Sequence, residues 1–429
     1  MSQRRLRVFM LGWEFSPLIA GGLGVVAKSL TERLSGTHGT DVTYVLPRIP
    51  SGTKFNFPGI KFKDASGAKP SRIRFLEVEA GLVSPYFSPE INKQEHFSSA
   101  DSSSLLDGSS DPKKDIYSED LMQEIDAYAR KSLTYAKKSK HDIVHNHDWM
   151  TAPAAEAAST ATKKPMLMHI HSTEYERTIG NPNQDIFNIE RRGMAKADCI
   201  IAVSQKTKER IVANYGISSD KIKVVHNAVE ITENKYGEIA KAIHKDDNVV
   251  LFLARLTAMK GANYLLEAAP KVLKHQPKTK FVFIGKGELG EQLIEQSVGL
   301  GIANKVTFTG FLPHEQVDRA YRLADVFIMP SVAEPFGITP LEAIKNGTPV
   351  ILSKQSGVSE VLQNVLKVDF WDTDELANKI IAILKHGVLA EELANNSRRD
   401  LSNISWDEQS RQVFEIYKDI TNKYKFNYS

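Results

Sequence analysis

Short runs of hydrophobic, β-branched and aromatic residues alternate along the chain with longer segments in which hydrophobic residues recur at helical spacing. Hydrophobic runs of this length, bounded by turn-forming residues, are typical of strands in a parallel sheet that helices cover on both faces. The pattern therefore predicts repeated strand–helix units and an α/β fold. The predicted strands lie at residues 6–13, 41–47, 72–80, 142–148, 165–171, 199–204 and 221–228, and then at 249–255, 280–287, 305–311, 325–331 and 348–354.

A polar stretch without strand periodicity, residues 230–247, separates the two sets of strands and is the predicted linker. Single hydrophobic cores stop growing near ~250–300 residues, so a chain of 429 residues favours two domains. We expect two doubly wound, Rossmann-like parallel-sheet domains, residues 1–230 and 231–403, that face each other across a cleft. An amphipathic helix at residues 404–420 is expected to pack back on the first domain, and the serine-rich region at about 96–114 is predicted to be an inserted loop.

The composition excludes several classes of protein. Hydrophobic residues make up 41% and charged residues 25%, which is ordinary for a globular protein and rules out wholesale disorder. The formal net charge of +3 creates no strong positive field, so we expect no nucleic-acid partner. The single cysteine, Cys199, excludes a disulfide framework and fits a reducing cytoplasm. No apolar stretch reaches the ~18 residues of a membrane-spanning helix, so we expect a cytoplasmic protein without a transmembrane segment.

Two glutamates flank a loop-to-helix junction after the predicted strand at residues 325–331. Glu334 lies on the loop, Glu342 lies in the first helical turn, and Gly337 between them disfavours helix. Thr339 is the predicted N-cap, and Thr339 with Glu342 satisfies a capping-box pattern. Glu342 therefore has two interpretations of about equal weight, capping or hydrogen bonding to sugar or ribose hydroxyls, whereas capping does not account for Glu334.

Two cations follow the predicted strand at residues 249–255. Arg255 ends the strand, and Lys260 comes shortly after it. A planar guanidinium fork and an ammonium point charge can together hold a diphosphate. Their position at a strand end, in the same domain as the two glutamates, favours such a clamp over a solvated loop.

Glycines and histidines follow strands of the first domain. Gly21 and Gly22 precede a helix, where their amides can meet a phosphate or a sugar, although a plain turn accounts for them almost as well. His169 and His171 alternate onto one face, as metal ligands would, but the sequence shows no third ligand nearby, and we expect no metal site. His171, at a strand end, is the histidine expected to face the cleft.

Two further patterns have competing interpretations. Residues 285–290 match the G-x-G-x-x-G dinucleotide fingerprint. They follow the second strand of their domain, and no acidic ribose ligand ends the next strand, so a dehydrogenase is disfavoured. Asp372 and Asp374 are similar to the D-x-D of metal-dependent sugar transferases, but Asp374 directly precedes a helical segment and is predicted to cap it.

These motifs together resemble the retaining glycosyltransferases of the GT-B fold, the group that includes glycogen and starch synthases. The resemblance covers nearly the whole chain and rests above all on an E-x7-E signature, here Glu334 to Glu342. The sequence HSTE at residues 171–174 is similar to glycogen synthases of archaeal and eukaryotic type. Supporting segments are ARLTAMKG, FIGKGEL, VVHNAVE, VHNHDW and WEFSPLIAGGLG.

The resemblance implies a role for each residue of these motifs in the second domain. Arg255 and Lys260 would bind the donor diphosphate, and Glu342 the nucleotide ribose. Glu334 would contact the transferred sugar. The backbone amides implied at the phosphate or sugar are those of Gly337 and Ile338.

In the first domain the resemblance implies that Gly22 approaches the donor and that His171 faces the reacting sugar, with Arg177 nearby. The predicted catalytic residues are thus His171, Arg255, Lys260 and Glu334.

The function implied is that of a retaining hexosyltransferase without a cofactor. The donor would be a nucleotide diphosphate sugar such as UDP-glucose or ADP-glucose, and the favoured acceptor is a hydroxyl group of an α-glucan, as in glycogen biosynthesis. Three alternatives stay open: a lipid or exopolysaccharide glycosyltransferase, a nucleotide-sugar 2-epimerase, and a non-catalytic sugar-nucleotide-binding protein.

Overall fold

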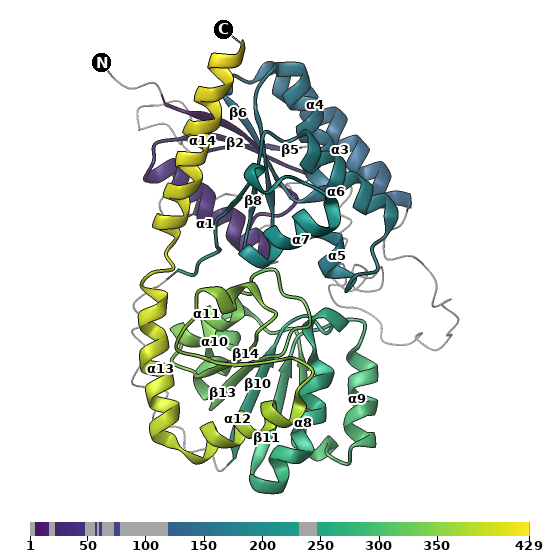
Figure 1. Ribbon diagram of the computed structural model, residues 1–429, viewed down its shortest axis with the longest axis vertical. Helices are drawn as coiled ribbons and strands as arrows, with labels where there is room; N and C mark the ends of the chain where they lie inside the picture. Colours follow the sequence, from purple (N-terminus) through teal and green to yellow (C-terminus); the bar gives the residue numbers. More distant parts are fainter. Residues whose placement is uncertain are drawn as a thin grey trace.

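The structure, a computed structural model, describes residues 5–16, 22–47, 56–57, 60–61, 73–77, 119–230 and 247–428. It contains two parallel sheets flanked by helices, which lie one above the other in Figure 1. The predicted α/β fold with two doubly wound parallel sheets is therefore confirmed. The serine-rich region at 96–114 and residues 231–246 of the predicted linker lie outside the described residues.

The first sheet has seven parallel strands in the order β5-β2-β1-β6-β7-β8-β9. All seven strands predicted for this half are present. They are β1 (Arg7–Leu11), β2 (Asp41–Leu46), β5 (Ile73–Glu77), β6 (Ile143–His147), β7 (Met166–Ile170), β8 (Cys199–Ala202) and β9 (Ile222–Val224), beside a separate antiparallel pair, β3 (Asn56–Phe57) and β4 (Ile60–Lys61).

The second sheet has six parallel strands in the order β12-β11-β10-β13-β14-β15. Its strands are β10 (Asn248–Leu253), β11 (Thr279–Ile284), β12 (Val306–Gly310), β13 (Val326–Met329), β14 (Val350–Ser353) and β15 (Leu366–Val368), of which only β15 was not predicted. In each sheet the strand order reverses beside the first strand, between β1 and β6 and between β10 and β13. Ligands of doubly wound sheets bind at such a reversal, beyond the carboxyl ends of the strands.

Helices cover both faces of each sheet, as the hydrophobic strands require. In β1, Val8 and Met10 pack in a cluster with residues of α1 and α14, whereas Phe9 and Leu11 pack in a cluster with α3 and α4. The helices of the first half are α1 (Gly22–Gly36), α3 (Glu119–Lys138), α4 (Ala152–Thr162), α5 (Glu174–Arg177), α6 (Gln184–Lys196) and α7 (Gln205–Tyr215). Those of the second half are α8 (Ala262–His275), α9 (Gly290–Gly299), α10 (His314–Leu323), α11 (Thr339–Lys345), α12 (Thr373–Lys385), α13 (Gly387–Leu401) and α14 (Trp406–Tyr428).

The last helix, α14, leaves the second sheet and lies along the first one, where Figure 1 shows it in yellow. Arg33 of α1 pairs with Asp407 of α14 at 2.9 Å. The side chain of Tyr417 is fully buried, and its hydroxyl lies 2.6 Å from Nδ1 of His145 on β6. None of the helices in the described part of the chain combines the length and apolar character needed to span a bilayer.

One predicted helix cap is wrong. Asp372, not Asp374, is the N-cap of α12, and its carboxylate accepts a hydrogen bond from the backbone N–H of Glu375 at 2.9 Å. Asp374 lies inside the first turn and pairs with Lys271. The helix begins two residues earlier than its hydrophobic periodicity indicates, at Thr373, because the cap carboxylate directs the start of the first turn.

A carboxylate from the second sheet holds a helix of the first. Glu360, on the short 3₁₀ segment Gly357–Glu360, accepts hydrogen bonds from the backbone N–H groups of Gln205 (2.8 Å) and Lys206 (2.9 Å), the first two residues of α7. It also bonds to Nε2 of His226 at 3.1 Å. A carboxylate is stabilised at this helix end by the amides and the helix dipole, so this contact helps to fix how the two sheets face each other.

The backbones approach closely at the same place. A side chain at Gly357 would put its Cβ 2.0 Å from the carbonyl oxygen of Pro335 and 2.6 Å from Cβ of Ser204, the N-cap of α7. These separations are far below van der Waals contact, so only glycine fits at this position.

We expect Glu360→Gln to loosen this contact in a pH-dependent way. Burial acts to raise the pKa of Glu360, but hydrogen bonds from His226 and the two amides outweigh it and hold the pKa below its usual value. The contact therefore stabilises the fold fully above the unfolded-state pKa of about 4.3 and loses its effect as the pH falls through the folded-state pKa. The variant should unfold with a Tm lower by a few degrees at pH 7, about 1–2 kcal/mol, and the difference should shrink on acidification.

The measurement is a set of thermal melts from pH 7 downwards, with Glu291→Gln, an exposed carboxylate on α9, as the matched control. Identical Tm values for the two variants at pH 7 would show that the Glu360 charge does not hold the sheets together.

Candidate active site

Lys260 and Glu334 meet at the strand reversal of the second sheet. Lys260 ends the 3₁₀ segment Ala258–Lys260 after β10, and Glu334 lies on the loop after the neighbouring strand β13. The Lys260 ammonium donates to Oε2 of Glu334 at 2.6 Å, with side chains 15% and 9% exposed. Two residues predicted from separate motifs thus form one partly buried ion pair at the edge where a ligand of this fold would bind.

The loop that carries Glu334 is fixed by backbone contacts. The Glu334 carbonyl accepts a hydrogen bond from the N–H of Gly357 at 2.9 Å, and the Ser331 hydroxyl lies 3.4 Å from the Glu334 carboxylate. Gly337 has a φ of 95°, in the left-handed region that glycine tolerates, and a Cβ there would lie 3.0 Å from Cγ of Glu334. Glycine at this position therefore allows the loop to fold tightly around the Glu334 side chain.

The capping interpretation of Thr339 and Glu342 is wrong. Helix α11 begins at Thr339 with Ile338 as its N-cap, no side chain caps it, and the Thr339 hydroxyl instead lies 3.8 Å from the sulfur of Met329. The Glu342 carboxylate accepts a hydrogen bond from the buried hydroxyl of Tyr321 on α10 at 3.0 Å. The helix starts one residue earlier than predicted, which places Thr339 at its first position and Pro340 at its second, so Thr339 is not the cap.

Residues at the edge of the first sheet approach this site from the opposite side. A Cβ on Gly22, the first residue of α1, would lie 3.5 Å from Cδ1 of Ile338. Glu14, just after β1, is buried, and burial raises its pKa while the N–H of Gly24 and the positive charge of Arg255 act in the opposite direction. Gly22 and Glu14 of the first half of the chain thus lie near Ile338 and Arg255, two predicted donor-binding residues of the second half.

His171 follows β7 and is held through both its backbone and its ring. Its backbone N–H donates to Oδ1 of Asp148 at 2.6 Å, and its Nε2 lies 2.9 Å from Nδ1 of His147 at the end of β6. Burial lowers the pKa of His171 well below its usual value and that of His147 to about 3, so both rings are neutral at pH 7. Burial raises the pKa of Asp148 to about 7.

Arg177 lies in a buried ion-pair network with residues of the segment that follows His171 and of helix α6. Its guanidinium donates to Glu190 at 2.7 Å, to Glu174 at 3.1 Å and to the Ser172 hydroxyl at 2.9 Å, and the side chain is 6% exposed. These contacts brace the segment that follows His171. The predicted role of Arg177 in donor binding stays a prediction.

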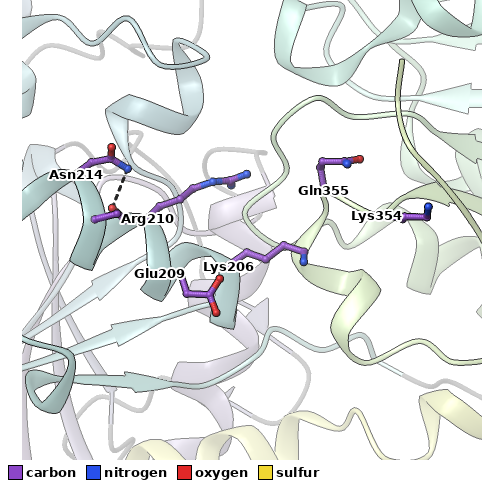
Figure 2. Close-up of a pocket in the computed structure, with 7 residues that line it drawn as sticks. Lys206, Glu209, Arg210, Asn214, Lys354 and Gln355 are labelled. Carbon is purple, nitrogen blue, oxygen red and sulfur yellow. Dashed lines mark hydrogen bonds between the residues drawn. The ribbon is translucent and has the colours of Figure 1, made fainter. Parts of the chain in front are cut away.

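A cavity of about 390 Å³ opens on the flank of the Glu360 contact, between α7 and the loop after β14. Figure 2 shows Lys206, Glu209, Arg210 and Asn214 of α7 on one side and Lys354 and Gln355 on the other. Its lining includes none of the predicted site residues. Arg210 is paired with Glu176 and Lys354 with Asp369, so two of its cations are already neutralised by the protein.

Sequence reasoning missed Glu14, Asp148 and His147 as parts of this site. Glu14 is a charge in an otherwise apolar run, which was a usable signal. Asp148 has a φ of 56°, and such strain in a non-glycine residue often marks a functional site, but it is visible only in the structure. His147 becomes relevant because β6 and β7 pair in register, with His147 opposite His169.

Two family descriptions match most of the described chain. The family described as Glycosyl transferases group 1 matches residues 238–400, which include Arg255, Lys260, Glu334 and Glu342. The family described as Glycosyltransferase Family 4 matches residues 109–233, which include His171.

Individual proteins are similar over nearly the full length. An uncharacterized glycosyltransferase of Methanocaldococcus jannaschii is 28% identical over 96% of this chain and 98% of its own length. A glycogen synthase of Mycobacterium tuberculosis is 25% identical over 96% of this chain and 94% of its own. The solved structure of sucrose-phosphate synthase from Thermosynechococcus elongatus superposes with a TM-score of 0.74 at 19% identity, covering 98% of this chain and 100% of that chain, and so shares the fold. Together these matches show that the chain has the GT-B fold and that it is built from two glycosyltransferase family segments, of which residues 238–400 belong to the glycosyl transferases group 1.

Proposed function

We propose that this glycosyltransferase moves glucose from a nucleotide diphosphate sugar to a hydroxyl group of an α-glucan, with retention of the anomeric configuration. The observation that carries the proposal is the Lys260–Glu334 pair at the strand reversal of the second sheet. Gly22 and Glu14 of the first half lie near Ile338 and Arg255 of the same half as the pair. The similarity to a glycogen synthase over nearly the whole chain supports a glucan as acceptor.

Positive charge at the site would stabilise the leaving nucleotide diphosphate. The Lys260 ammonium has three N–H donors, so it can keep its bond to Glu334 and still donate to phosphate oxygens. Arg255, two residues beyond the end of the same strand, β10, supplies the second cation. Fixed donors of this kind typically contribute about 3–4 kcal/mol each to transition-state stabilisation, so the chain's own residues can support departure of the diphosphate.

Acidic and imidazole groups would orient the sugar. The Glu334 carboxylate, held by Lys260 and the loop contacts, is the proposed partner of the sugar hydroxyls. His171, fixed by Asp148 and His147, is proposed to face the reacting carbon from the first sheet. We propose front-face attack by the acceptor hydroxyl, with a donor phosphate oxygen taking its proton, inside a site that closure of the two sheets shields from water.

The direct test supplies UDP-glucose and ADP-glucose in turn to the purified protein, with glycogen or a lipid acceptor, and follows both products by NMR. The proposal predicts new α-linkages on glycogen. Transfer only to lipid would favour the alternative acceptor, an epimerised sugar without acceptor would favour the 2-epimerase, and calorimetric binding without turnover would favour a binding protein. A β-linked product, or a glycosyl adduct trapped on a side chain, would contradict the mechanism.

Lys260→Ala should lower turnover by about 10²–10³-fold, because it removes one fixed donor to the leaving group. It also leaves Glu334 without its ion-pair partner and should lower the Tm. Lys260→Arg keeps the charge and the pair, so we expect it to recover the Tm and part of the activity. Steady-state kinetics and melts are the measurements, with Lys274→Ala on the exposed face of α8 as control. Wild-type turnover in Lys260→Ala would eliminate the diphosphate clamp.

Glu342→Gln should weaken donor binding about tenfold without changing the Tm. Glutamine can still accept the hydrogen bond from Tyr321, so the fold is preserved, while a charged acceptor for ribose hydroxyls is lost. Calorimetry with a nucleoside diphosphate and with its 2′,3′-dideoxy analogue separates the roles. If Glu342 binds ribose, the variant should bind both compounds equally weakly, whereas a preference for the hydroxylated compound as large as in the wild type would assign ribose binding elsewhere.

A further inference from the structure

Four histidines gather at the carboxyl ends of β6 and β7. His145 and His147 alternate onto one face of β6, and His169 and His171 onto the same face of the paired strand. Neighbouring rings have centroids 4.2 to 5.7 Å apart. The group lies on the face of the first sheet that α14 covers, since Tyr417 of α14 bonds to His145.

Most nitrogens of this cluster are buried without a hydrogen-bond partner. The residues His145, His147 and His169 are 0%, 1% and 2% exposed. Nε2 of His145, Nε2 of His147 and both ring nitrogens of His169 have no partner, and the same holds for Nδ1 of His171. Buried polar atoms are almost always hydrogen-bonded, and each exception calls for a physical explanation.

Three of these rings bring one nitrogen each close together. One ligand nitrogen from each of His145, His147 and His169 lies within 4.8 Å of the other two. A tetrahedral zinc ion with bonds of about 2.0–2.1 Å would hold its ligand nitrogens about 3.4 Å apart. Small rotations of the side chains would close the remaining difference.

In His145 and His147 the Nδ1 atom lies within hydrogen-bonding distance of another side chain, which leaves Nε2 as the nitrogen without a partner. Nδ1 of His145 lies 2.6 Å from the Tyr417 hydroxyl, and Nδ1 of His147 lies 2.9 Å from Nε2 of His171. When Nδ1 donates such a bond, Nε2 carries the lone pair and its ring orientation is fixed, as in most histidine metal sites.

From this geometry we infer that His145, His147 and His169 form a buried binding site for one divalent transition-metal ion, with Zn²⁺ the favoured occupant. Imidazole nitrogens select zinc, copper, nickel or iron, whereas magnesium and calcium prefer oxygen ligands. The sequence alone predicted no metal site because only His169 and His171 were recognised as possible ligands on one face of a strand. In the structure β6 pairs with β7, so His145 and His147 of β6 join His169, and His171 is not one of the three proposed ligands. The bound ion would tie α14 to the sheet through Tyr417 and would fix the His147 ring that contacts His171.

The experiment measures metal in the full-length chain, independently of transferase activity. Protein purified from zinc-supplemented medium is expected to hold about one Zn²⁺ per chain by mass spectrometry. After removal of zinc with a chelator, Co²⁺ should bind one to one and give the intense visible bands of a four- or five-coordinate ion. Both ions should raise the Tm.

His169→Gln is the informative variant because neither nitrogen of His169 has a partner to lose, and it should abolish stoichiometric binding. Tyr417→Phe removes only the group behind His145 and should weaken Co²⁺ binding about 10–100-fold. The matched control is His141→Gln, a buried histidine that bonds to Ser139 and Thr162 outside the cluster, and it should bind metal as the wild type does.

Metal-free protein that gives no Co²⁺ bands would overturn the inference. Binding that is unchanged in both His169→Gln and Tyr417→Phe would also overturn it, because the ion would then lie elsewhere. If His169→Gln does not fold, the weakened binding expected of Tyr417→Phe decides the question.

Discussion

The contact between the Glu360 carboxylate and the first amides of α7 helps to hold together the two halves on which the site depends. In each parallel sheet the loops after the strands lie at one edge. The cations Arg255 and Lys260 lie at the edge of the second sheet, whereas Glu14 and Gly22 belong to the first half of the chain. Gly22 lies beside Ile338, the charge of Arg255 acts on Glu14, and α7 contacts the segment at Gly357, so all three contacts join the first half of the chain to the second. A helix end offers amides that would otherwise lack partners, and a carboxylate from the other sheet satisfies them.

Much of the fold could be predicted because a strand buried on both faces has a nearly continuous hydrophobic sequence. All twelve predicted strands are present in the two parallel sheets. β15 escaped prediction because only three residues, Leu366–Val368, form it, next to polar neighbours. The helix starts at Thr339 and Thr373 were misplaced by one or two residues because several side chains of the right type compete to be the cap, and tertiary contacts such as that of Tyr321 with Glu342 decide among them.

The site was predictable where a residue's chemistry follows from its position at a strand end. Lys260 and Glu334 were assigned from separate motifs, and the adjacency of β10 and β13 brings them together. The histidine cluster was not predictable in this way, because its convergence depends on the register of β6 against β7 and on a helix that begins more than two hundred residues later, at Trp406. Glu14 depends likewise on the approach of the other sheet.

The return of α14 to the first sheet means that the chain passes between the two halves twice. One passage lies between β9 and β10, and the other between α13, which packs on α11 and α12, and α14, which packs on α1. A domain that is joined to another by a single covalent connection can rotate about any axis. With two separate connections, the easiest motion is rotation about the line that joins them. Any opening and closing of the space between the two halves would then be a rotation about this one axis. The same residues of the two halves would face each other each time the space closes.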